Sequence, residues 1–285
     1  MCSQVYKKVV GKGGKVRGTK LSIPLHTYDI VKFSVGKEVE MKYTITGDNL
    51  QVVTLNLEGN EAVYAEAGAM IYMSSNMHME AKAKGGLFKG LKRKMTGESF
   101  FLTEFTPEGS AGFVGFAGNA PGTIKAIELA LGKDFIAQKD AFLCAENGVD
   151  LDIAFQKRLG AVFFGGEGFI LQRLSGSGNV FIHACGDFIE KELKPNEVIK
   201  VDTGCVVGFD ESVGYDIQRA GSVKTMFFGG EGIFITTLTG PGNVILQSMT
   251  LGNLASALRQ FLPRGGGTSG AASSGLGIAG RLLRG

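Results

Sequence analysis

Short runs of apolar residues alternate with polar positions along most of the chain, which is the period of two that half-buried β-strands show. Clusters of Gly, Pro, Ser and Asn separate these runs and predict tight turns between neighbouring strands. Residues 124–131 could form a helix, but their apolar positions also alternate, so we expect a strand there. One short helix is expected to begin with Asn253 as its cap and to end at Pro263. The pattern therefore predicts an all-β protein with a short C-terminal helix.

A block of eighteen residues occurs twice, at 163–180 and at 227–244, with eleven identical positions at an offset of 64. A fainter copy precedes them at 97–109. Each copy is an apolar run, a Gly/Pro/Ser/Asn turn and a further apolar run, which is the pattern of a β-hairpin. Three hairpins of one kind are therefore predicted.

A second motif precedes each hairpin and begins with an acidic residue, at 66–70, 140–144 and 202–206. Recurring supersecondary units of this size indicate tandem repeats. We expect an all-β fold of three tandem short double-stranded β-helix or barrel repeats in a pseudo-threefold arrangement. The predicted divisions are a basic N-terminal extension (1–40), a triplicated β domain (41–254, with repeats at about 41–124, 125–189 and 190–254), and a short helix with a flexible Gly/Ser-rich tail (255–285).

Glycine is the one large deviation in an otherwise ordinary globular composition, with 44 glycines among 285 residues. Aliphatic and aromatic residues run through most of the chain, which excludes low-complexity disorder, and the glycines lack the three-residue period of collagen. The net charge is +3, but residues 1–40 carry eight Lys or Arg and three acids, which leaves −2 for the remainder. The body therefore does not carry the charge of a nucleic-acid-binding surface.

Compartment signals are few. No apolar run reaches the roughly 18 residues that a membrane-spanning helix needs, and no secretory leader follows the N-terminal basic residues. The four cysteines form no Cys-X-X-Cys pair, and four thiols in this length are not a disulfide framework. We therefore expect a cytoplasmic, reduced protein without a transmembrane segment.

The usual constellations of catalysis are absent from the sequence. The three histidines lie in three different segments, and His183 with Cys185 is interpreted as a partly buried pair on one strand face. The chain has no Gly-X-Ser-X-Gly motif, and no helix is expected after the Gly-Gly-Glu-Gly motifs, so they predict turns rather than a dinucleotide site. No catalytic residue, metal site or cofactor is predicted with any specificity.

Acidic residues recur at two places in the repeats. Each place has one acidic residue per repeat, which makes two trios. If the repeats surrounded a threefold axis, the three carboxylates of a trio could meet there and bind a cation or share protons. The more economical interpretation is that each carboxylate accepts local backbone amide hydrogen bonds at its own turn. The two trios are Glu98, Glu167 and Glu231, and Glu66, Asp140 and Asp202.

The strongest surface signal is the basic segment 81–95, which holds six basic residues and no acid. Its apolar residues follow a helical spacing, so it could lie on an anionic membrane surface or dock on an acidic partner. A solvated loop that folds back on the β domain is the structural alternative. The residues of this predicted surface are Leu87, Phe88, Lys89, Leu91, Lys92, Arg93 and Lys94.

The order of motifs resembles one known family. The motifs are Met41-Lys42-Tyr43, Asn49-Leu50-Gln51-Val52-Val53, Ala65-Glu66-Ala67-Gly68-Ala69-Met70, Leu91-Lys92-Arg93, Gly97-Glu98-Ser99-Phe100-Phe101 and the two Phe-Phe-Gly-Gly-Glu-Gly repeats. This order is similar to that of the altered-inheritance-of-mitochondria family, long a domain of unknown function, over about residues 41–262. The resemblance implies double-stranded β units like those of the tryptophan RNA-binding attenuator fold. Eukaryotic relatives are associated with mitochondrial inner-membrane organisation, and no catalytic residues carry over.

Three functions remain open at this point. The first is a non-enzymatic scaffold or assembly protein that self-associates or binds another protein, and that could touch an anionic membrane through residues 81–95. The second is a small-ligand or metal-binding β-barrel that uses the repeated carboxylates. The third is RNA binding by fold analogy, which the charge of the body disfavours.

Overall fold

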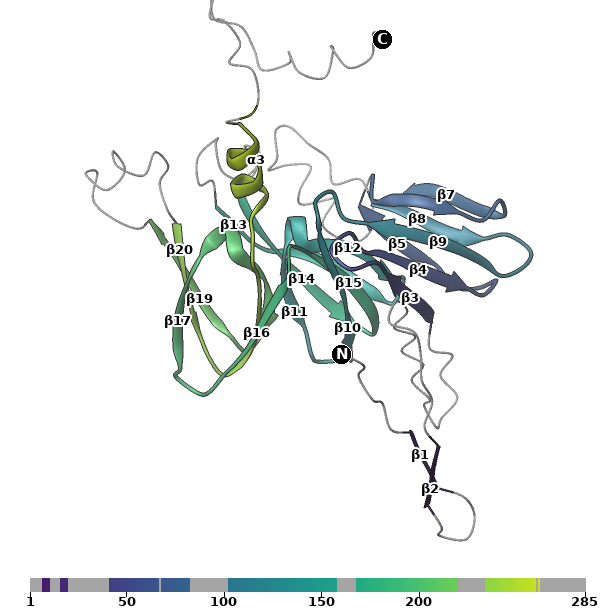
Figure 1. The fold of residues 1–285 in the computed structure, drawn as a ribbon, viewed down its shortest axis with the longest axis horizontal. Helices are drawn as coiled ribbons and strands as arrows, with labels where there is room; N and C mark the ends of the chain where they lie inside the picture. Colours follow the sequence, from purple (N-terminus) through teal and green to yellow (C-terminus); the bar gives the residue numbers. More distant parts are fainter. Residues whose placement is uncertain are drawn as a thin grey trace, which may run out of the picture.

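Runs of Val, Ile and Phe that are broken by glycine turns fold into antiparallel strands throughout the β domain (Figure 1). The computed structural model describes residues 41–66, 68–82, 102–157, 168–219, 234–259 and 261, and the backbone of 7–10 and 16–19. Within these residues the protein is mostly β, with one short helix, α3 (Leu251–Arg259), near the C-terminal end. The predicted all-β class is therefore confirmed, and residues 124–131 fall mostly in a strand, as expected.

The strands fall into three consecutive groups, here called the first, second and third units. The first unit contains β3 (Lys42–Thr46), β4 (Val52–Leu57), β5 (Val63–Glu66), β6 (Met70–Met73), β7 (Met77–Lys82), β8 (Leu102–Pro107) and β9 (Gly112–Ala117). The second contains β10 (Gly122–Leu129), β11 (Phe135–Gln138), the 3-10 turn η1 (Lys139–Ala141), β12 (Phe142–Glu146), β13 (Val149–Lys157), β14 (Phe169–Gly176) and β15 (Gly178–Cys185). The third contains β16 (Phe188–Leu193), β17 (Val198–Asp202), the 3-10 turn η3 (Thr203–Cys205), β18 (Val206–Asp210), β19 (Gly214–Arg219), β20 (Phe234–Thr239) and β21 (Gly242–Gln247). A separate hairpin joins β1 (Lys7–Val10) and β2 (Val16–Thr19).

Each unit contributes two half-sheets with the same strand order. A half-sheet here is a set of three neighbouring strands from one unit. The first kind has the strand order β4-β9-β6 in the first unit, β10-β15-β12 in the second and β16-β21-β18 in the third. The second kind has the order β5-β8-β7, β11-β14-β13 and β17-β20-β19. Half-sheets of neighbouring units then join edge to edge. The resulting four sheets, in chain order, are sheet I (β3-β4-β9-β6), sheet II (β10-β15-β12-β5-β8-β7), sheet III (β13-β14-β11-β18-β21-β16) and sheet IV (β17-β20-β19).

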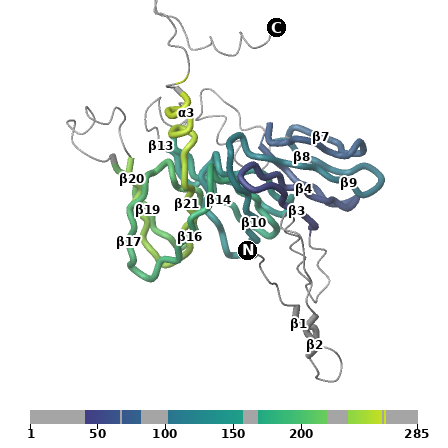
Figure 2. The backbone as a smooth tube through the Cα atoms, in the orientation of Figure 1, coloured from purple at the N-terminus to yellow at the C-terminus, as the bar shows by residue number. Residues whose placement is uncertain are grey.

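Three apolar layers hold the sheets together. Val53 and Phe116 of sheet I pack with Phe105 of sheet II. Ile182 of sheet II packs with Leu174 of sheet III, and further residues of sheet III, among them Phe209, pack with Leu238 of sheet IV. The alternation seen in the sequence lets one strand face two layers, because successive side chains point to opposite faces. The four sheets therefore form one continuous stack, and the units follow one another in chain order (Figure 2).

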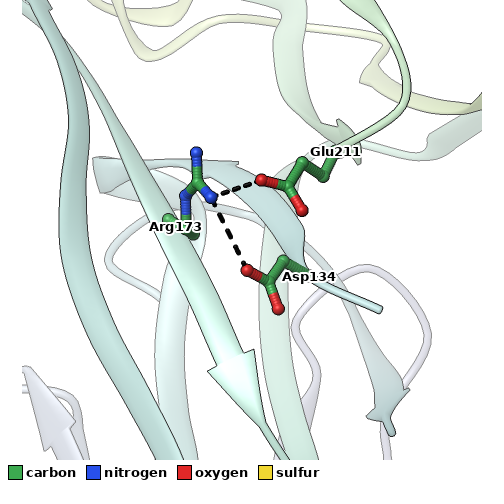
Figure 3. A network of polar contacts seen from close by, with 3 residues as sticks. All are labelled: Asp134, Arg173 and Glu211. Carbon is green, nitrogen blue, oxygen red and sulfur yellow. Dashed lines mark hydrogen bonds and ion pairs between the residues drawn. The ribbon is translucent and has the colours of Figure 1, made fainter. Parts of the chain in front are cut away.

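Two joints between half-sheets connect the units. At the first joint β12 pairs with β5, and at the second joint β18 pairs with β11. At the first joint, the buried hydroxyl of Tyr64 on β5 donates to the carbonyl oxygen of Val149, 3.0 Å away in the second unit. At the second joint, Arg173 of β14 lies 3.7 Å from Asp134 and also contacts Glu211 of the third unit (Figure 3). These ion pairs are partly exposed, so the paired strands and apolar layers dominate the joints.

Two expectations need correction, and the pseudo-threefold arrangement stays a prediction. The strands predicted as hairpins do not pair with each other: β14 lies in sheet III and β15 in sheet II, while β20 lies in sheet IV and β21 in sheet III, so each turn leads from one sheet to another. The helix α3 begins at Leu251 instead of Asn253, because the hydroxyl of Thr250 accepts the hydrogen bond from the Asn253 amide, at 3.0 Å, and Thr250 is therefore the cap. A closed pseudo-threefold ring would need a third joint between β6 and β17. In the described strands, sheet I ends at β6 and sheet IV ends at β17, and the two edges are not paired with each other.

Candidate functional site

A cavity of about 240 Å³ lies where the first and second units meet. The turn between β5 and β6, the segment after β9, the region of η1 and β12, and β15 form its walls. Three ionisable side chains line it, Glu66, Asp140 and His183. Sequence analysis had placed these residues in separate motifs, and the fold brings all three to one cavity.

His183 is a buried residue that lines this cavity. Its ring packs so closely against Gly118 that a side-chain carbon at that position would overlap it, so glycine is required there for steric reasons. Burial lowers the pKa of His183 below its usual range, and a hydrogen bond with the backbone of Ala120 opposes part of that shift. The imidazole is therefore neutral at pH 7, the form that accepts hydrogen bonds and binds metals or cationic ligands.

The carboxylate of Asp140 is held by its own turn. Its Oδ2 accepts a hydrogen bond from the Gln138 amide group at 3.0 Å, and the Gln138 Oε1 accepts from the Ala141 backbone N–H at 3.1 Å. Gln138 thereby caps η1. A fixed aspartate beside a neutral histidine provides hydrogen-bond acceptors at one wall of the cavity.

The strand register shows that Glu66, Asp140 and Asp202 do not occupy equivalent positions in the three units. Glu66 pairs with Leu102, Gln138 with Leu171 and Asp202 with Ile235, which are equivalent positions of the three half-sheets β5-β8-β7, β11-β14-β13 and β17-β20-β19. Gln138 therefore occupies the place that was assigned to Asp140. The sequence alignment was wrong by two residues, because it matched acid to acid while the second unit has an amide at this position.

Asp202 behaves as a local cap. Its Oδ1 accepts a hydrogen bond from the Gly204 backbone N–H at 2.9 Å, at the start of η3. This is the economical interpretation of the repeated acids, an acceptor for the amides of its own turn. The residue does not line the cavity that holds Glu66 and Asp140.

At the second joint, a glutamine occupies the position that His183 has at the first joint. Gln247 of β21 occupies the position equivalent to His183, since each lies five residues after the glycine that begins its strand. Its amide group donates to the Gly204 carbonyl oxygen and accepts from the Cys185 N–H, both at 2.8 Å. A polar side chain that bridges two units is thus a feature of both joints, and an ionisable one belongs to the first joint.

The described residues provide neither a cluster of metal ligands nor a reactive thiol. Within the described part of the chain, no three His, Cys, Asp or Glu side chains converge closely enough to hold a metal ion. Burial raises the pKa of Cys144, Cys185 and Cys205, and Asp202 raises that of Cys205 further. These thiols are protonated at pH 7 and are poor nucleophiles.

A second candidate site consists of two of the outer strands, β6 at the edge of sheet I and β17 at the edge of sheet IV, which sequence analysis did not identify. On β6, Ile71 and Tyr72 are exposed, and the Tyr72 ring packs edge-on against exposed Phe113 with centroids 6.1 Å apart. The Tyr72 hydroxyl lies 2.5 Å from the hydroxyl of Thr54. On β17, Val198 is exposed. The unbroken apolar run Met70–Met73 was the available signal, because a strand exposed on one face would alternate.

Several predicted site residues lie outside the described part of the chain. The basic segment 81–95 is described only at its first two residues, which end β7. The structure therefore leaves this predicted surface untested. The remaining residues outside the described ranges are Leu87, Phe88, Lys89, Leu91, Lys92, Arg93 and Lys94 of the segment, and the carboxylates Glu98, Glu167 and Glu231.

None of the helices among the described residues has the length and apolar character needed to cross a bilayer.

Comparison with known proteins gives three consistent matches. The sequence profile of the family described as Mitochondrial biogenesis AIM24 matches residues 43–249. An uncharacterized protein of Streptococcus pyogenes serotype M6 is 30% identical over 232 residues, which cover 78% of this chain and 92% of that protein. The crystal structure of a Streptococcus pyogenes protein is similar with a TM-score of 0.65 and 26% identity, over 78% of this chain and 100% of the other.

Proposed function

Because the chain belongs to the mitochondrial biogenesis AIM24 family, whose matched relative is uncharacterized, we propose a function from the site itself: a non-enzymatic scaffold that assembles through its free sheet edges. The proposal treats the three units as tandem repeats of one short double-stranded β element. Their shared strand order supports this interpretation.

The observation that carries the proposal is the contrast between inner and outer sheets. Sheets II and III are each composed of two half-sheets, whereas sheet IV is a single half-sheet and sheet I is a half-sheet with β3 added at its other side. Unpaired strand edges present backbone N–H and C=O groups that add a further strand readily. Apolar side chains at such an edge mark a protein interaction site.

Sedimentation velocity tests the proposal directly. The protein is expected to sediment as larger species as its concentration rises, or to form a complex with a protein partner. Flotation with anionic and neutral liposomes serves as the parallel arm, because the basic segment 81–95 predicts anionic-selective binding that is lost when Lys92, Arg93 and Lys94 become Gln. A protein that stays monomeric, floats with neither liposome and recovers no partner would exclude a scaffold role.

The cavity at the first joint favours a second candidate function, binding of a small polar ligand. Neutral His183 and Asp140, which line the same cavity, offer acceptors to a hydrogen-bond donor. Titration with methylammonium, a small hydrogen-bond donor, followed by the backbone amide NMR signals of β15, is expected to shift those signals, and His183→Gln is expected to weaken the saturable response. Unchanged signals in the wild-type protein would argue that the cavity is structural.

A further inference from the structure

Strand pairing shows which residues of the two joints correspond. Ile182 of β15 lies opposite Phe142, and Leu246 of β21 lies opposite Val206, in both cases directly before a bulge. The residues that follow on β15 and β21 are the histidine of the first joint and the glutamine of the second. The two joints can therefore be compared side chain by side chain.

At the second joint, the carboxamide of Gln247 lies between two backbone groups. Its oxygen accepts a hydrogen bond from the Cys185 N–H, and its nitrogen donates to the Gly204 carbonyl oxygen, both at 2.8 Å. Cys185 ends a strand of the second unit, and Gly204 belongs to η3 of the third unit. One planar amide group thus joins two units by acting as acceptor and donor at once.

The equivalents of these two backbone groups belong to Asn119 and Asp140. Asn119 and Cys185 each lie seven residues after the glycine that begins their strand. Asp140 and Gly204 each lie two residues after the last paired residue of β11 or β17. Both Asn119 and Asp140 line the cavity at the first joint. The cavity therefore lies where the second joint holds a carboxamide.

The imidazole of His183 is turned toward a different partner, the backbone of Ala120. This hydrogen bond favours the protonated ring and raises its pKa, so the ring N–H donates and the Ala120 carbonyl oxygen accepts. The ring rests on Gly118 and lies close to Gly122. The second joint has Ala184 at the position of Gly118, where a side-chain carbon would overlap a ring placed in this way. The histidine is thus accommodated by glycines of the first unit.

The size of the cavity suits a small ligand. Its volume of about 240 Å³ is many times the roughly 10 to 15 Å³ that one water molecule requires, and it is smaller than the roughly 300 to 1,000 Å³ of sites for drug-sized molecules. Its lining comes from both units, with Asn119 in the first and Asp140 and His183 in the second. A ligand in this cavity contacts both sides of the joint.

We propose that the cavity at the first joint binds a small molecule that ends in a primary carboxamide, whose amide group takes the place that the Gln247 side chain has at the second joint. The Asn119 N–H donates to the ligand's carbonyl oxygen, and the ligand's NH₂ group donates to the Asp140 carbonyl oxygen. The second N–H of that group is left for the neutral imidazole of His183, which lines the same cavity. This inference rests on the second candidate function, binding of a small polar ligand, and names the class of that ligand.

The pairing of one donor with one acceptor distinguishes a carboxamide from other small ligands. Methylammonium donates hydrogen bonds but accepts none, whereas acetone accepts but does not donate. Each of them can satisfy only one of the two backbone groups. Since one hydrogen bond contributes modestly to binding, acetamide is expected to bind about tenfold more tightly than either.

Titration of the full-length protein with acetamide, followed by its backbone amide NMR signals, tests the inference. Saturable shifts are expected for Asn119 and for η1, with a dissociation constant in the millimolar range because the ligand has few atoms. The signals of Gly204 and of the Gln247 side chain are the internal control and are expected not to shift. Acetone, which is matched to acetamide in size, is expected to shift the same signals about tenfold more weakly.

His183→Gln introduces at the first joint the side chain that the second joint has. The introduced carboxamide is expected to occupy the place of the ligand, so the response to acetamide is lost. The amide signals of the sheets are expected to persist, which separates occupation of the site from misfolding.

Gln247→Ala is the converse variant. It removes from the second joint the group that acetamide replaces, and acetamide is expected to shift the Gly204 signal in this variant and to raise its urea midpoint. Gln218→Ala, at an exposed glutamine of β19, is the matched control and is expected to respond to acetamide as the wild-type protein does.

The outcomes distinguish this inference from the candidate function on which it rests. A response to methylammonium without one to acetamide, equal binding of acetone and acetamide, or undiminished acetamide binding by His183→Gln overturns the carboxamide inference and leaves a site for another small polar ligand. No response to acetamide or to methylammonium overturns both.

Discussion

The cavity at the first joint depends on one residue, His183, whose counterpart at the second joint is Gln247. Both side chains bridge two units, but only the histidine changes charge near neutral pH. Burial holds the pKa of His183 below its usual range. The first joint is therefore sensitive to acid in a way that the second joint is not.

A stability measurement tests this difference. Because the pKa of His183 is lower in the folded than in the unfolded state, the unfolded state takes up the proton first as pH falls. The contribution of neutral His183 is fully present above about pH 6.5, the unfolded value, and is lost progressively as pH falls toward the folded pKa. Urea unfolding of His183→Gln is expected to show a weaker loss of stability between neutral and mildly acidic pH.

An identical pH profile for His183→Gln and the wild-type protein would mean that His183 does not titrate with unfolding.

At the scale of elements, the sequence predicted the strands and turns that are determined by residues close together in the chain. The repeated blocks correctly placed strands β14, β15, β20 and β21 and the turns between them, because local Gly, Ser, Pro and Asn residues form those turns. The predicted hairpin pairing was wrong, because β14 and β15 lie in different sheets, and so do β20 and β21. The helix cap was missed by three residues, since Thr250 and Asn253 are both good caps and only the hydrogen bond distinguishes them.

The pairing of strands from different units could not be predicted from the sequence pattern. Alternation tells which face of a strand is apolar, but it does not tell which strand edge another strand will join. The joints β5–β12 and β11–β18 connect segments about 70 to 80 residues apart, and the position of Asp140 relative to Glu66 depended on them. The sequence therefore identified His183, Glu66 and Asp140 as separate candidate residues, and it did not predict the cavity that they line.

At the scale of the whole molecule, the described residues from 41 to 247 form a stack of four sheets in which the end sheets differ from the inner ones. Each inner sheet is completed by the neighbouring unit, and this completion buries the apolar side chains of both partners. The end sheets present the same pairing groups without a partner in the chain itself, as far as the described residues extend. These edges, unpaired among the described strands, are the basis of the proposed scaffold function.

Hydrogen exchange at increasing protein concentration tests this account most directly. Backbone amides of β6 (Met70–Met73) and β17 (Val198–Asp202) are expected to exchange more slowly together as concentration rises, because both edges become hydrogen-bonded in the same contact. The free edges β3 and β19 are the internal controls and are expected not to change. Exchange of β6 and β17 that is independent of concentration, or slowing confined to β3 and β19, would contradict assembly through the edges of β6 and β17.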